Sequence, residues 1–583
     1  MINPFGDVFP DTIIRDNKIR HKKTGEGTGK DFLFRIYILT FITALAMGIL
    51  YWRLFVLTVV EGSQYKRMAQ ENRIREINIS APRGIIYDRN KNPLIRNIPL
   101  ITDISGKMLN TPSGENDIES IEASTREYIY GDVFGNLLGY IGETDPDDLK
   151  KLASVGNKTL DNQPYKLRDT IGKMGIEKVY DRWLRGNDGQ ELFEVNATGN
   201  YIRTLGRVEA TTGNNLILNI DLELSKKATE ILKGQKAGII ASDPETGSIL
   251  LLVSSPSFDP NIILKDEDIS TIFANPDQPL FNRAIAGLYP PGSTFKIVTA
   301  LSALESGSVN AKSTVEDTGV LNVGENYSFA NWYFTQYGKT EGQVDLVKAI
   351  QRSNDIYFYK AGEFTGISNL AKWARIMGTG KLSGIDLDGE EKGLMPDPQW
   401  QKKIKGENWF LGNTYHTAIG QGDVLTTPLQ VNLWTNVIAS NGKLCRPNIS
   451  QSKKENCIAL PFIKDNIKLV KDGMVKACQT GGTGWPLFNF TVENDKINID
   501  GINFLEAPQS TASAKKRVEV TTACKTGTAE FGDEKDRTHA WFTVFAPVEK
   551  PQISLTILIE GGGEGSSVAG PVAKELLKLW FER

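Results

Sequence analysis

Residues 289–296 read Tyr-Pro-Pro-Gly-Ser-Thr-Phe-Lys, and apolar residues with helical spacing follow over Ile297–Leu304. Proline and glycine interrupt the chain just before Ser293, so the pattern predicts that Ser293 lies at the start of a helix. There its hydroxyl and backbone N–H would face a developing negative charge, which the helix dipole helps to stabilise. Lys296 follows three residues later and is expected beside Ser293 on the same helix face. A lysine with a lowered pKa can serve as the base that a serine nucleophile needs.

Ser-x-x-Lys alone is a weak signal, because the chain repeats it at Ser63, Ser450 and Ser513. Two further motifs strengthen it. Ser353-Asn354-Asp355 comes about 60 residues after Ser293, before an apolar helical stretch, and Lys525-Thr526-Gly527-Thr528 comes about 170 residues after that, within an expected strand. Taken singly, such residues fit a helix N-cap or an ordinary strand lysine. Together and in this order, they indicate an acyl-transfer site.

The overall composition excludes several classes of protein. Lys and Arg number 67 and Asp and Glu number 70, giving a net charge of −3, which argues against a nucleic-acid-binding protein. The three histidines, His21, His416 and His539, lack metal-ligand spacing, and the four cysteines form no Cys-x-x-Cys pair. We therefore expect no nucleic acid, no metal, no cofactor and a catalytic base other than imidazole.

One apolar segment predicts a membrane helix. Ile36–Trp52 and Leu54–Val60 contain no charged residue, and only Arg53 separates them. About 20 apolar residues span a bilayer. We therefore expect a single transmembrane helix over residues 32–60.

A buried core helix and a cleaved signal peptide are the alternatives for this segment. Its length disfavours a core helix, and the apolar run continues well past Ala44-Leu45-Ala46, which mimics a cleavage site. Basic residues are almost balanced on the two sides, so the orientation rests on the short polar stretch before the helix. We expect residues 1–31 to be a cytoplasmic tail and residues 61–583 to be exported.

The exported part divides near residue 229. Residues 61–228 show short β-type runs without a catalytic cluster and predict an extended β-rich spacer or interaction module. Residues 229–583 open with two apolar runs, Ala237–Ser242 and Ser248–Ser254, whose Pro244–Gly247 connection predicts a β-hairpin.

The end of the chain predicts the rest of the sheet. Pro571 is expected to open a C-terminal helix. Two early strands, a long helical insert, three late strands and a final helix predict one α+β domain with an antiparallel five-stranded sheet. The late strands are expected at Val518–Thr528, His539–Phe545 and Gln552–Glu560.

These motifs resemble those of class B penicillin-binding proteins, most of all the penicillin-binding protein 2 branch of the elongation machinery. The resemblance covers nearly everything after residue 60. It implies a penicillin-binding/β-lactamase-like transpeptidase domain after a pedestal of the dimerisation type, without the glycosyltransferase domain of class A proteins. Asp355, where many relatives have Asn, fits the elongation branch better than the division branch. Further matching stretches are Asn72–Arg75, Pro82–Asn90, Gly175–Glu177, Asp243–Gly247, Asn282-Arg283, Ile419–Gly422 and Thr427–Gln430.

The resemblance implies a role for each residue of the site. Ser293 is the acylated nucleophile, which attacks the carbonyl of the penultimate D-Ala of a stem pentapeptide, and Lys296 is its base. Ser353 relays a proton between Lys296 or Lys525 and the leaving amine. Asp355 helps to hold Lys296, and Lys525 adds a second positive charge.

The same resemblance assigns the substrate contacts to the Lys-Thr-Gly-Thr segment. The hydroxyls of Thr526 and Thr528, on either side of Gly527, bind the terminal carboxylate of the substrate. The backbone N–H groups of Ser293 and Thr528 form the oxyanion hole.

The family also implies partners. Peptidoglycan stem peptides would be the substrates, and β-lactams would acylate Ser293. A polytopic lipid-II glycan polymerase and elongation-complex proteins are the expected partners, met at the inner membrane with the catalytic domain outside the cytoplasm. We expect Tyr415, His416 and His539 to pack or line the cleft, and Gly420-Gln421-Gly422 to be a structural turn near it.

Two features depart from the family pattern. Cys524 precedes Lys525 where relatives usually have Gly, and a thiol there is expected to add bulk beside the active-site strand. Residues Asn489–Ala514 form an unexpected insertion of polar loop and short strands. For Cys445 and Cys457, twelve residues apart, a disulfide and buried free thiols are equally open.

Other functions remain open at this point. A D,D-carboxypeptidase or a β-lactamase uses the same motifs, although a large pedestal and an anchor are unnecessary for releasing small products. A septal transpeptidase differs only in its place of action. A non-enzymatic scaffold or β-lactam sensor is disfavoured by the intact motifs and the short tail.

Overall fold

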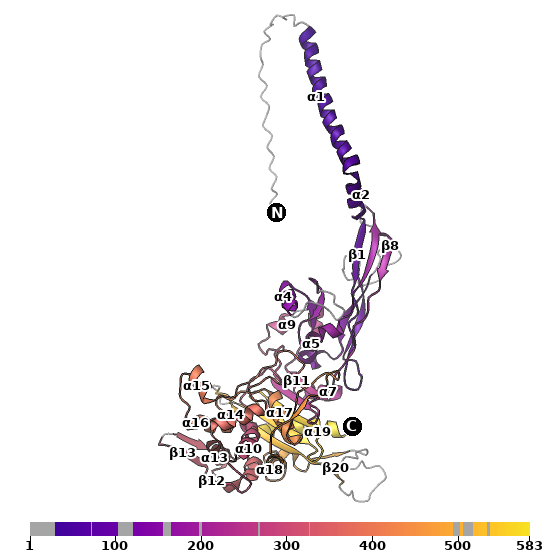
Figure 1. The fold of residues 1–583 in the computed structure, drawn as a ribbon. Helices are drawn as coiled ribbons and strands as arrows, with labels where there is room; N and C mark the ends of the chain where they lie inside the picture. Colours follow the sequence, from indigo (N-terminus) through magenta and orange to yellow (C-terminus); the bar gives the residue numbers. More distant parts are fainter. Residues whose placement is uncertain are drawn as a thin grey trace, which may run out of the picture. The chain divides into compact units, whose positions relative to one another are not determined.

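The structure is a computed structural model of the 583-residue chain (Figure 1). Contacts group the chain into two compact units, residues 1–77 with 191–207, and residues 78–190 with 208–583. The structure describes residues 29–71, 73–102, 121–154, 165–196, 201–265, 269–325, 327–493, 502–504, 517–532 and 537–583.

The first unit contains the expected apolar helix. Phe32–Val60 is long and apolar enough to cross a membrane, with a mean hydropathy of 2.0. The helix over 32–60 is confirmed, while its crossing of a membrane stays a prediction. Residues 1–28 of the expected tail lie outside the described residues. The elements are α1 (Gly29–Phe55), the π-helical turn η1 (Val56–Val60), α2 (Gly62–Glu71) and most of a three-stranded sheet in the order β1 (Ile74–Ile79), β7 (Gly189–Val195), β8 (Tyr201–Val208).

The second unit begins with short strands and helices, as expected for the β-rich region before residue 229. The boundary at 228/229 itself stays a prediction. These elements are β2 (Ile86–Tyr87), β3 (Ile95–Thr102), β4 (Ile121–Tyr128), η2 (Gly131–Val133), α3 (Gly135–Leu138), β5 (Ile141–Glu143), α4 (Pro146–Ser154), β6 (Thr170–Gly172), α5 (Gly175–Val179), α6 (Asp181–Leu184), β9 (Leu216–Ile217) and α7 (Leu222–Ile231).

A five-stranded antiparallel sheet forms the centre of this unit, in the order β11-β10-β23-β22-β21. The predicted hairpin is confirmed as β10 (Ala237–Ser242) and β11 (Ile249–Ser255). The late strands are β21 (Ala523–Glu530), β22 (Thr538–Ala546) and β23 (Ile553–Ile559). Among the described strands, β21 pairs only with β22 and therefore forms one edge of the sheet.

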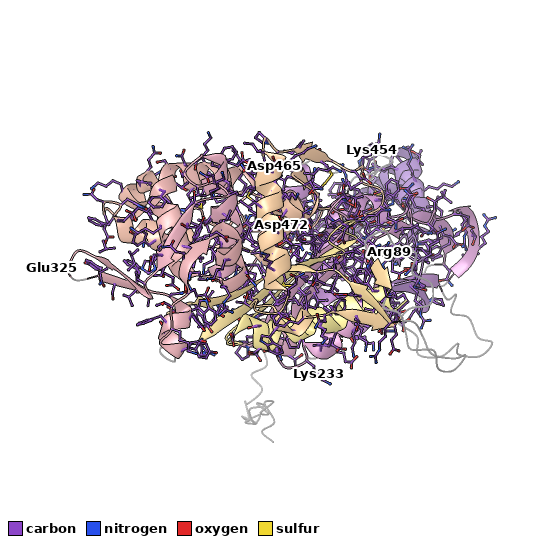
Figure 2. All side chains as sticks on the ribbon, turned by 90° about the horizontal axis from the view of Figure 1, so that it is seen from below. Arg89, Lys233, Glu325, Lys454, Asp465 and Asp472 are labelled. Atoms are coloured by element: carbon purple, nitrogen blue, oxygen red, sulfur yellow. A yellow bond between two sulfur atoms is a disulfide. The ribbon has the colours of Figure 1, made fainter. Side chains whose placement is uncertain are left out.

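Alternate residues of the strands supply two hydrophobic cores, one on each face of the sheet. Trp541 and Phe545 of β22 pack with the helices of the long insert, whereas Phe542 and Val544 pack with α7 and α19 (Gly565–Phe581). The sheet is therefore a middle layer between helices, which confirms the α+β prediction. Figure 2 shows α18, marked by Asp465 and Asp472, on the insert side.

The insert supplies the walls of the site. Its elements are α8 (Pro260–Leu264), α9 (Ser270–Phe273), η3 (Gly292–Phe295), α10 (Lys296–Glu305), β12 (Thr314–Asp317), β13 (Val320–Val323), β14 (Tyr327–Ala330), α11 (Trp332–Tyr337), β15 (Gly342–Asp345), α12 (Leu346–Arg352), α13 (Asp355–Thr365), α14 (Ile367–Ile376), α15 (Pro398–Ile404), α16 (Leu411–Ala418), α17 (Pro428–Ala439), β16 (Lys443–Cys445), β17 (Cys457–Ala459), α18 (Lys464–Ala477) and η4 (Trp485–Leu487).

The final helix starts earlier than predicted. Pro571 lies inside α19, which begins at Gly565. A Cβ at Gly565 would stand 2.2 Å from Trp541 O and 2.4 Å from Gly527 O. The absence of a side chain therefore lets the first turn of α19 lie directly on β21 and β22, and this packing outweighs the preference of proline for the first helical turn.

The predicted strand Val518–Thr528 is two strands. β20 (Arg517–Val520) pairs with β18 (Thr491–Glu493) and β19 (Ile502–Phe504) in a separate small sheet, whereas β21 joins the central sheet. The chain changes partner at Thr521, whose hydroxyl accepts from Val548 N instead of continuing a ladder. The insertion at Asn489–Ala514 thus supplies two short strands, and its residues 494–501 and 505–514 lie outside the described residues.

All four cysteines are paired. Cys445 is bonded to Cys457, so the disulfide alternative holds and the free-thiol alternative is wrong. Cys524 is bonded to Cys478 at the end of α18, so the expected free thiol beside Lys525 is also wrong. The reason is that α18 runs against β21 and brings its last residues to the start of that strand.

Candidate active site

Ser293 lies in η3, the short 3₁₀ turn that leads into α10, so the predicted helix start is confirmed. Gly292 before it has a φ of +52°, and its N–H donates to Gly420 O at 2.9 Å. Gly420 has a φ of +74°, and a Cβ there would stand 2.3 Å from Gly292 O. The Gly420–Gly422 turn and the turn that carries Ser293 therefore support each other.

Ser353 joins two lysines that are completely buried. Lys525 Nζ donates to Ser353 Oγ at 2.9 Å and to Thr526 O at 2.9 Å. Lys296 Nζ donates to Ser353 O at 2.7 Å and lies 3.3 Å from Ser353 Oγ. It also donates to Asp355 Oδ1 at 2.6 Å. The three motifs thus meet as predicted, but Lys296 contacts the second motif, and no hydrogen bond joins it to Ser293 within the described part of the chain.

Burial changes the protonation of both lysines. Desolvation lowers the pKa of Lys296, while the charge of Asp355 opposes the change. Desolvation lowers the pKa of Lys525 well below the ordinary lysine value, and the charge of Lys296 lowers it further. Two ammonium groups so close in a dry site repel each other, so the pair releases one proton far more readily than an exposed lysine does.

Asp355 is held from two sides. Its Oδ1 accepts from Lys296, and its Oδ2 accepts from the backbone N–H of Trp332 at 3.0 Å. The indole N–H of Trp332 donates to Arg352 O at 3.0 Å, directly before Ser353. Helix α11 therefore fixes the short connection between α12 and α13 that carries Ser353 and Asp355.

The Lys-Thr-Gly-Thr segment lies on β21, across from the turn that carries Ser293. Thr526 Oγ1 donates to Thr483 Oγ1 at 2.8 Å. A Cβ at Gly527 would stand 2.9 Å from the Cβ of Trp541 and 3.0 Å from Thr294 Cγ2, so the absence of a side chain lets the strand lie close to the turn that carries Ser293. Thr528, one residue on, is exposed to the cleft.

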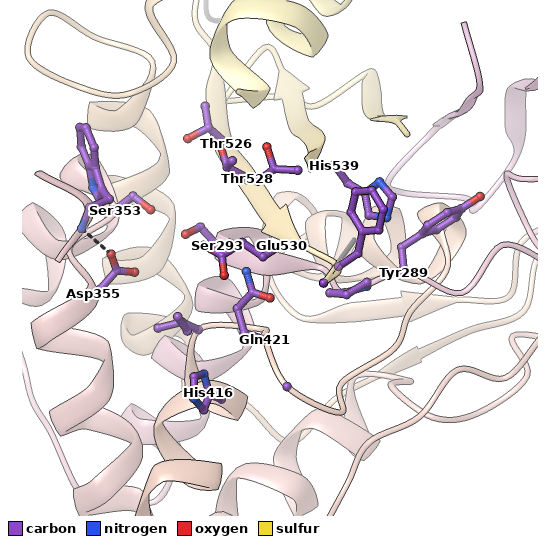
Figure 3. Close-up of a pocket in the computed structure, with 18 of the residues that line it drawn as sticks. Tyr289, Ser293, Ser353, Asp355, His416, Gln421, Thr526, Thr528, Glu530 and His539 are labelled. Carbon is purple, nitrogen blue, oxygen red and sulfur yellow. Dashed lines mark hydrogen bonds between the residues drawn. The ribbon is translucent and has the colours of Figure 1, made fainter. Parts of the chain in front are cut away.

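One cleft of about 1470 Å³ is lined by Ser293, Ser353, Asp355, Thr526 and Thr528. Figure 3 shows Ser293 near the centre, with Thr526 and Thr528 above it and Ser353 with Asp355 to the left. The expectation that His416 and His539 line the cleft is confirmed. Desolvation lowers the pKa of His416, so its imidazole is held toward the neutral form.

Gln421 connects two walls of this cleft. Its side-chain nitrogen donates to Glu530 O at 3.2 Å, and its side-chain oxygen accepts from Glu530 N at 3.1 Å, in the amide orientation that satisfies both. The Gly420-Gln421-Gly422 segment is therefore a structural turn, as expected, and it links the turn that carries Ser293 to the end of β21.

Sequence reasoning missed two contributors, Thr483 and Trp332. Trp332 binds Asp355 through its backbone N–H and Arg352 O through its indole N–H, and no local sequence pattern indicates either contact. Thr483 stands in the glycine-rich stretch Gly481–Gly484, and that stretch was the available signal. Among the described residues, no cluster of His, Cys, Asp and Glu is arranged to hold a metal ion.

Comparisons with known proteins agree with this arrangement. Residues 237–578 match the family described as penicillin binding protein transpeptidase domain. Residues 114–218 match the penicillin-binding protein dimerisation domain.

Three relatives illustrate the similarity. The chain is 33% identical over 479 residues to a peptidoglycan D,D-transpeptidase MrdA of Acinetobacter baumannii, covering 78% of this chain and 66% of that protein. It is 29% identical over 595 residues to the MrdA of Escherichia coli K12, covering 91% of this chain and 92% of that protein. The structure of penicillin-binding protein PBP2 from Helicobacter pylori, solved in complex with MreC, superposes with a TM-score of 0.69 and 28% identity. The match covers 87% of this chain and 98% of that chain. The chain therefore belongs to the penicillin-binding protein transpeptidase family.

Proposed function

We propose that this chain is a membrane-anchored peptidoglycan D,D-transpeptidase of the cell-wall elongation machinery. The observation that carries the proposal is the Ser353 hydroxyl between two buried lysines of lowered pKa, in the cleft that also exposes Ser293. Such a site supplies a base without imidazole, and the open edge of β21 offers backbone groups to an extended peptide.

In the proposed acylation, Ser293 Oγ attacks the carbonyl carbon of the penultimate D-Ala of a stem pentapeptide. Its proton passes to neutral Lys296. The N–H groups of Ser293 and Thr528 stabilise the tetrahedral oxyanion, a contribution of about 3–4 kcal/mol per donor in other enzymes. The terminal carboxylate binds to the hydroxyls of Thr526 and Thr528, beside Gly527 and the charge of the Lys525–Lys296 pair.

Collapse of the intermediate breaks the C–N bond and requires one proton on the leaving nitrogen. Ser353 Oγ lies within hydrogen-bond reach of both lysines, so it can donate its own proton to that nitrogen and receive another from a lysine. D-Ala leaves, and the amine of a neighbouring stem peptide then attacks the Ser293 ester. The new C–N bond forms, the C–O bond to Ser293 breaks, and the proton that the amine loses to the lysine pair is returned to Ser293 Oγ.

The location and partners belong to the same proposal. Helix 32–60 would cross the inner membrane once, with residues 229–583 as an exported transpeptidase domain and residues 61–228 as its pedestal. A polytopic lipid-II glycan polymerase would supply new strands, and elongation-complex proteins would bind the pedestal. The Helicobacter pylori relative, found with MreC, supports this reading. β-Lactams would acylate Ser293 in place of the stem peptide.

The experiment compares cross-linking with hydrolysis. Nascent pentapeptide strands are incubated with the full-length protein, and the muropeptides and free D-Ala are quantified. The proposal predicts one D-Ala released per cross-linked dimer, and neither product with Ser293→Ala. Tetrapeptide monomers with D-Ala but without dimers would instead identify a D,D-carboxypeptidase, and rapid turnover of penicillin would identify a β-lactamase.

A further inference from the structure

A carboxylate outside the three motifs lies at the centre of a hydrogen-bond cluster beneath Ser353. Asp317, the last residue of β12, is 3% exposed. Its Oδ1 accepts from Gly319 N at 2.8 Å. Its Oδ2 accepts from Asn331 Nδ2 at 2.8 Å, Asn354 Nδ2 at 2.9 Å and Glu341 N at 3.0 Å. One carboxylate therefore joins the end of β12 to the starts of α11, β15 and α13.

Two of these donors lead directly to the active site. Asn331, 1% exposed, accepts from Asp355 N through its Oδ1 at 3.1 Å. Asn354, also 1% exposed, accepts from Tyr357 N through its Oδ1 at 2.9 Å and thereby caps α13. The main chain of the Ser353–Asp355 connection is thus held by two amides whose other ends both donate to Asp317.

The charge of Asp317 is what orients these amides. Within the described residues Asp317 forms no ion pair, so its four N–H donors are what stabilise the buried anion. Because Asp317 can only accept, both amides turn their nitrogens toward it, which leaves the Asn331 oxygen facing Asp355 N and the Asn354 oxygen facing Tyr357 N. Ser353 has a φ of +55°, a left-handed value that a serine keeps only when its surroundings impose it.

We infer that Asp317 is a positioning residue for the acylation reaction, acting through Asn331 and Asn354 to place Ser353 and Asp355 against Lys296. This role rests on the proposed acylation of Ser293. It goes beyond the three motifs, because Asp317 contacts neither the lysines nor the cleft.

The test is the acylation of full-length Asp317→Asn by benzylpenicillin, measured as a second-order rate constant across pH. The substitution keeps the shape and leaves one oxygen for Asn331, Asn354 and Glu341 N, but it turns an NH₂ group toward Gly319 N and removes the negative charge that holds the four donors. We expect acylation to slow by about tenfold or more, since small misplacements at a reacting site have large effects. We also expect the rising limb of the pH profile to move to lower pH, because a displaced Asp355 no longer supports protonated Lys296.

Asp345→Asn is the matched control. Asp345 lies on β15, the strand paired with β12, and its Oδ1 caps α12 by accepting from Lys348 N at 2.7 Å. This variant loses a structural carboxylate on the partner strand of β12 and keeps all four hydrogen bonds of Asp317, so it should keep the wild-type rate and pH profile. Should Asp317→Asn fail to fold, Asn331→Ala tests the same link, because it removes the acceptor of Asp355 N and leaves Asp317 three donors.

The outcomes separate this inference from the proposed function. Wild-type rate and profile in a folded Asp317→Asn protein, or equal changes in Asp345→Asn, would overturn the positioning role while leaving Ser293 acylation intact. Absence of any penicillin adduct on the wild-type protein, or its persistence in Ser293→Ala, would instead overturn the proposed function.

Discussion

Ser353 Oγ is the atom at which the acid–base groups of the site meet. It lies 2.9 Å from Lys525 Nζ and 3.3 Å from Lys296 Nζ, and both lysines are buried. A buried ammonium is costly unless it is paired, and here one carboxylate, Asp355, contacts Lys296. The site therefore favours a state in which the two lysines together carry fewer than two positive charges, which is the state that the proposed Ser–Lys mechanism needs.

The rate of penicillin acylation should rise with pH through the neutral range. The pKa values of Lys296 and Lys525 are lowered, so the neutral base becomes available well below the ordinary lysine pKa of about 10.4. Below the midpoint we expect about a tenfold rise per pH unit, since one proton is lost. The measurement is the second-order rate constant of acylation between pH 5 and 10.

The Asp355→Asn variant tests whether the lysine pair causes this pH dependence. The charge of Asp355 raises the pKa of both lysines, so its removal should shift the rising limb to lower pH even if the maximal rate falls. A wild-type rate that stays constant up to pH 10 would show that the lysine pair does not control the pH dependence of acylation. A rising limb that moves to higher pH in Asp355→Asn would show the same.

The residues that the sequence could identify are those within the three short motifs. Each motif is local, so its residue types are visible together, and the order of motifs along the chain restricts the fold. Thr483, Trp332 and Asp317 escape such reasoning because each reaches the site through loops or main-chain atoms whose positions depend on packing far along the chain.

The turn around Gly420 shows how one segment supports another. Gly420→Ala should slow acylation by about tenfold or more, because its Cβ would stand 2.3 Å from Gly292 O and push on the turn that carries Ser293. The left-handed backbone adds about 1–2 kcal/mol of strain. The acylation rate constant and the melting temperature are the measurements.

Gly406→Ala is the control, because Gly406 has the same φ of +74° and a Cβ there would meet no atom of the described residues within 4 Å. Gly406→Ala should lower the melting temperature through the same left-handed backbone strain, and it should keep the wild-type acylation rate. Equal acylation in both variants would show that the Gly420–Gly292 contact does not position Ser293.

The two disulfides differ in the length of chain that they close. Cys478–Cys524 closes 46 residues and Cys445–Cys457 closes 12. The chain-entropy relation gives about 4 kcal/mol for the longer loop and about 3 kcal/mol for the shorter one. We expect Cys478→Ala/Cys524→Ala to lower the melting temperature more than Cys445→Ala/Cys457→Ala; the reverse order would contradict this account.

Secondary structure could be predicted where the pattern is local. The hairpin β10–β11 follows from two apolar runs and a turn. The start of α19 at Gly565 and the division between β20 and β21 could not be predicted, because both depend on contacts with segments distant in sequence, the main chain of β21 and β22 in one case and the insertion strands in the other.

The exposed apolar helix and the paired cysteines together support export of most of the chain. Disulfides persist in oxidising compartments and are rare in the cytosol. All four cysteines lie on the C-terminal side of helix 32–60. The apolar run and the cysteine positions are visible in the sequence, while export itself stays a prediction. The change of pattern near residue 229 was also visible, and only the assignment of residues 61–228 as a pedestal rested on family resemblance, since short strands without a strong period leave little local signal.

Anchoring by this helix can be tested with charges. Leu45→Arg/Ile49→Arg places two charges near the middle of the apolar segment, where each charge raises the free energy of membrane insertion by about 2.5–3.5 kcal/mol. We expect the protein to leave the membrane pellet on alkaline carbonate extraction. Phe32→Arg/Val60→Arg, with the same charges at the segment ends where arginine reaches the interface, should stay in the pellet. Equal extraction of both variants would contradict a membrane-spanning helix.

The intact mass of the full-length protein after incubation with benzylpenicillin addresses the proposed chemistry most directly. We predict a single stable adduct of one penicillin per chain, absent from folded Ser293→Ala. An adduct that persists in Ser293→Ala, or one that the wild-type protein hydrolyses within minutes, would contradict a Ser293 acyl-enzyme built for transfer to an amine.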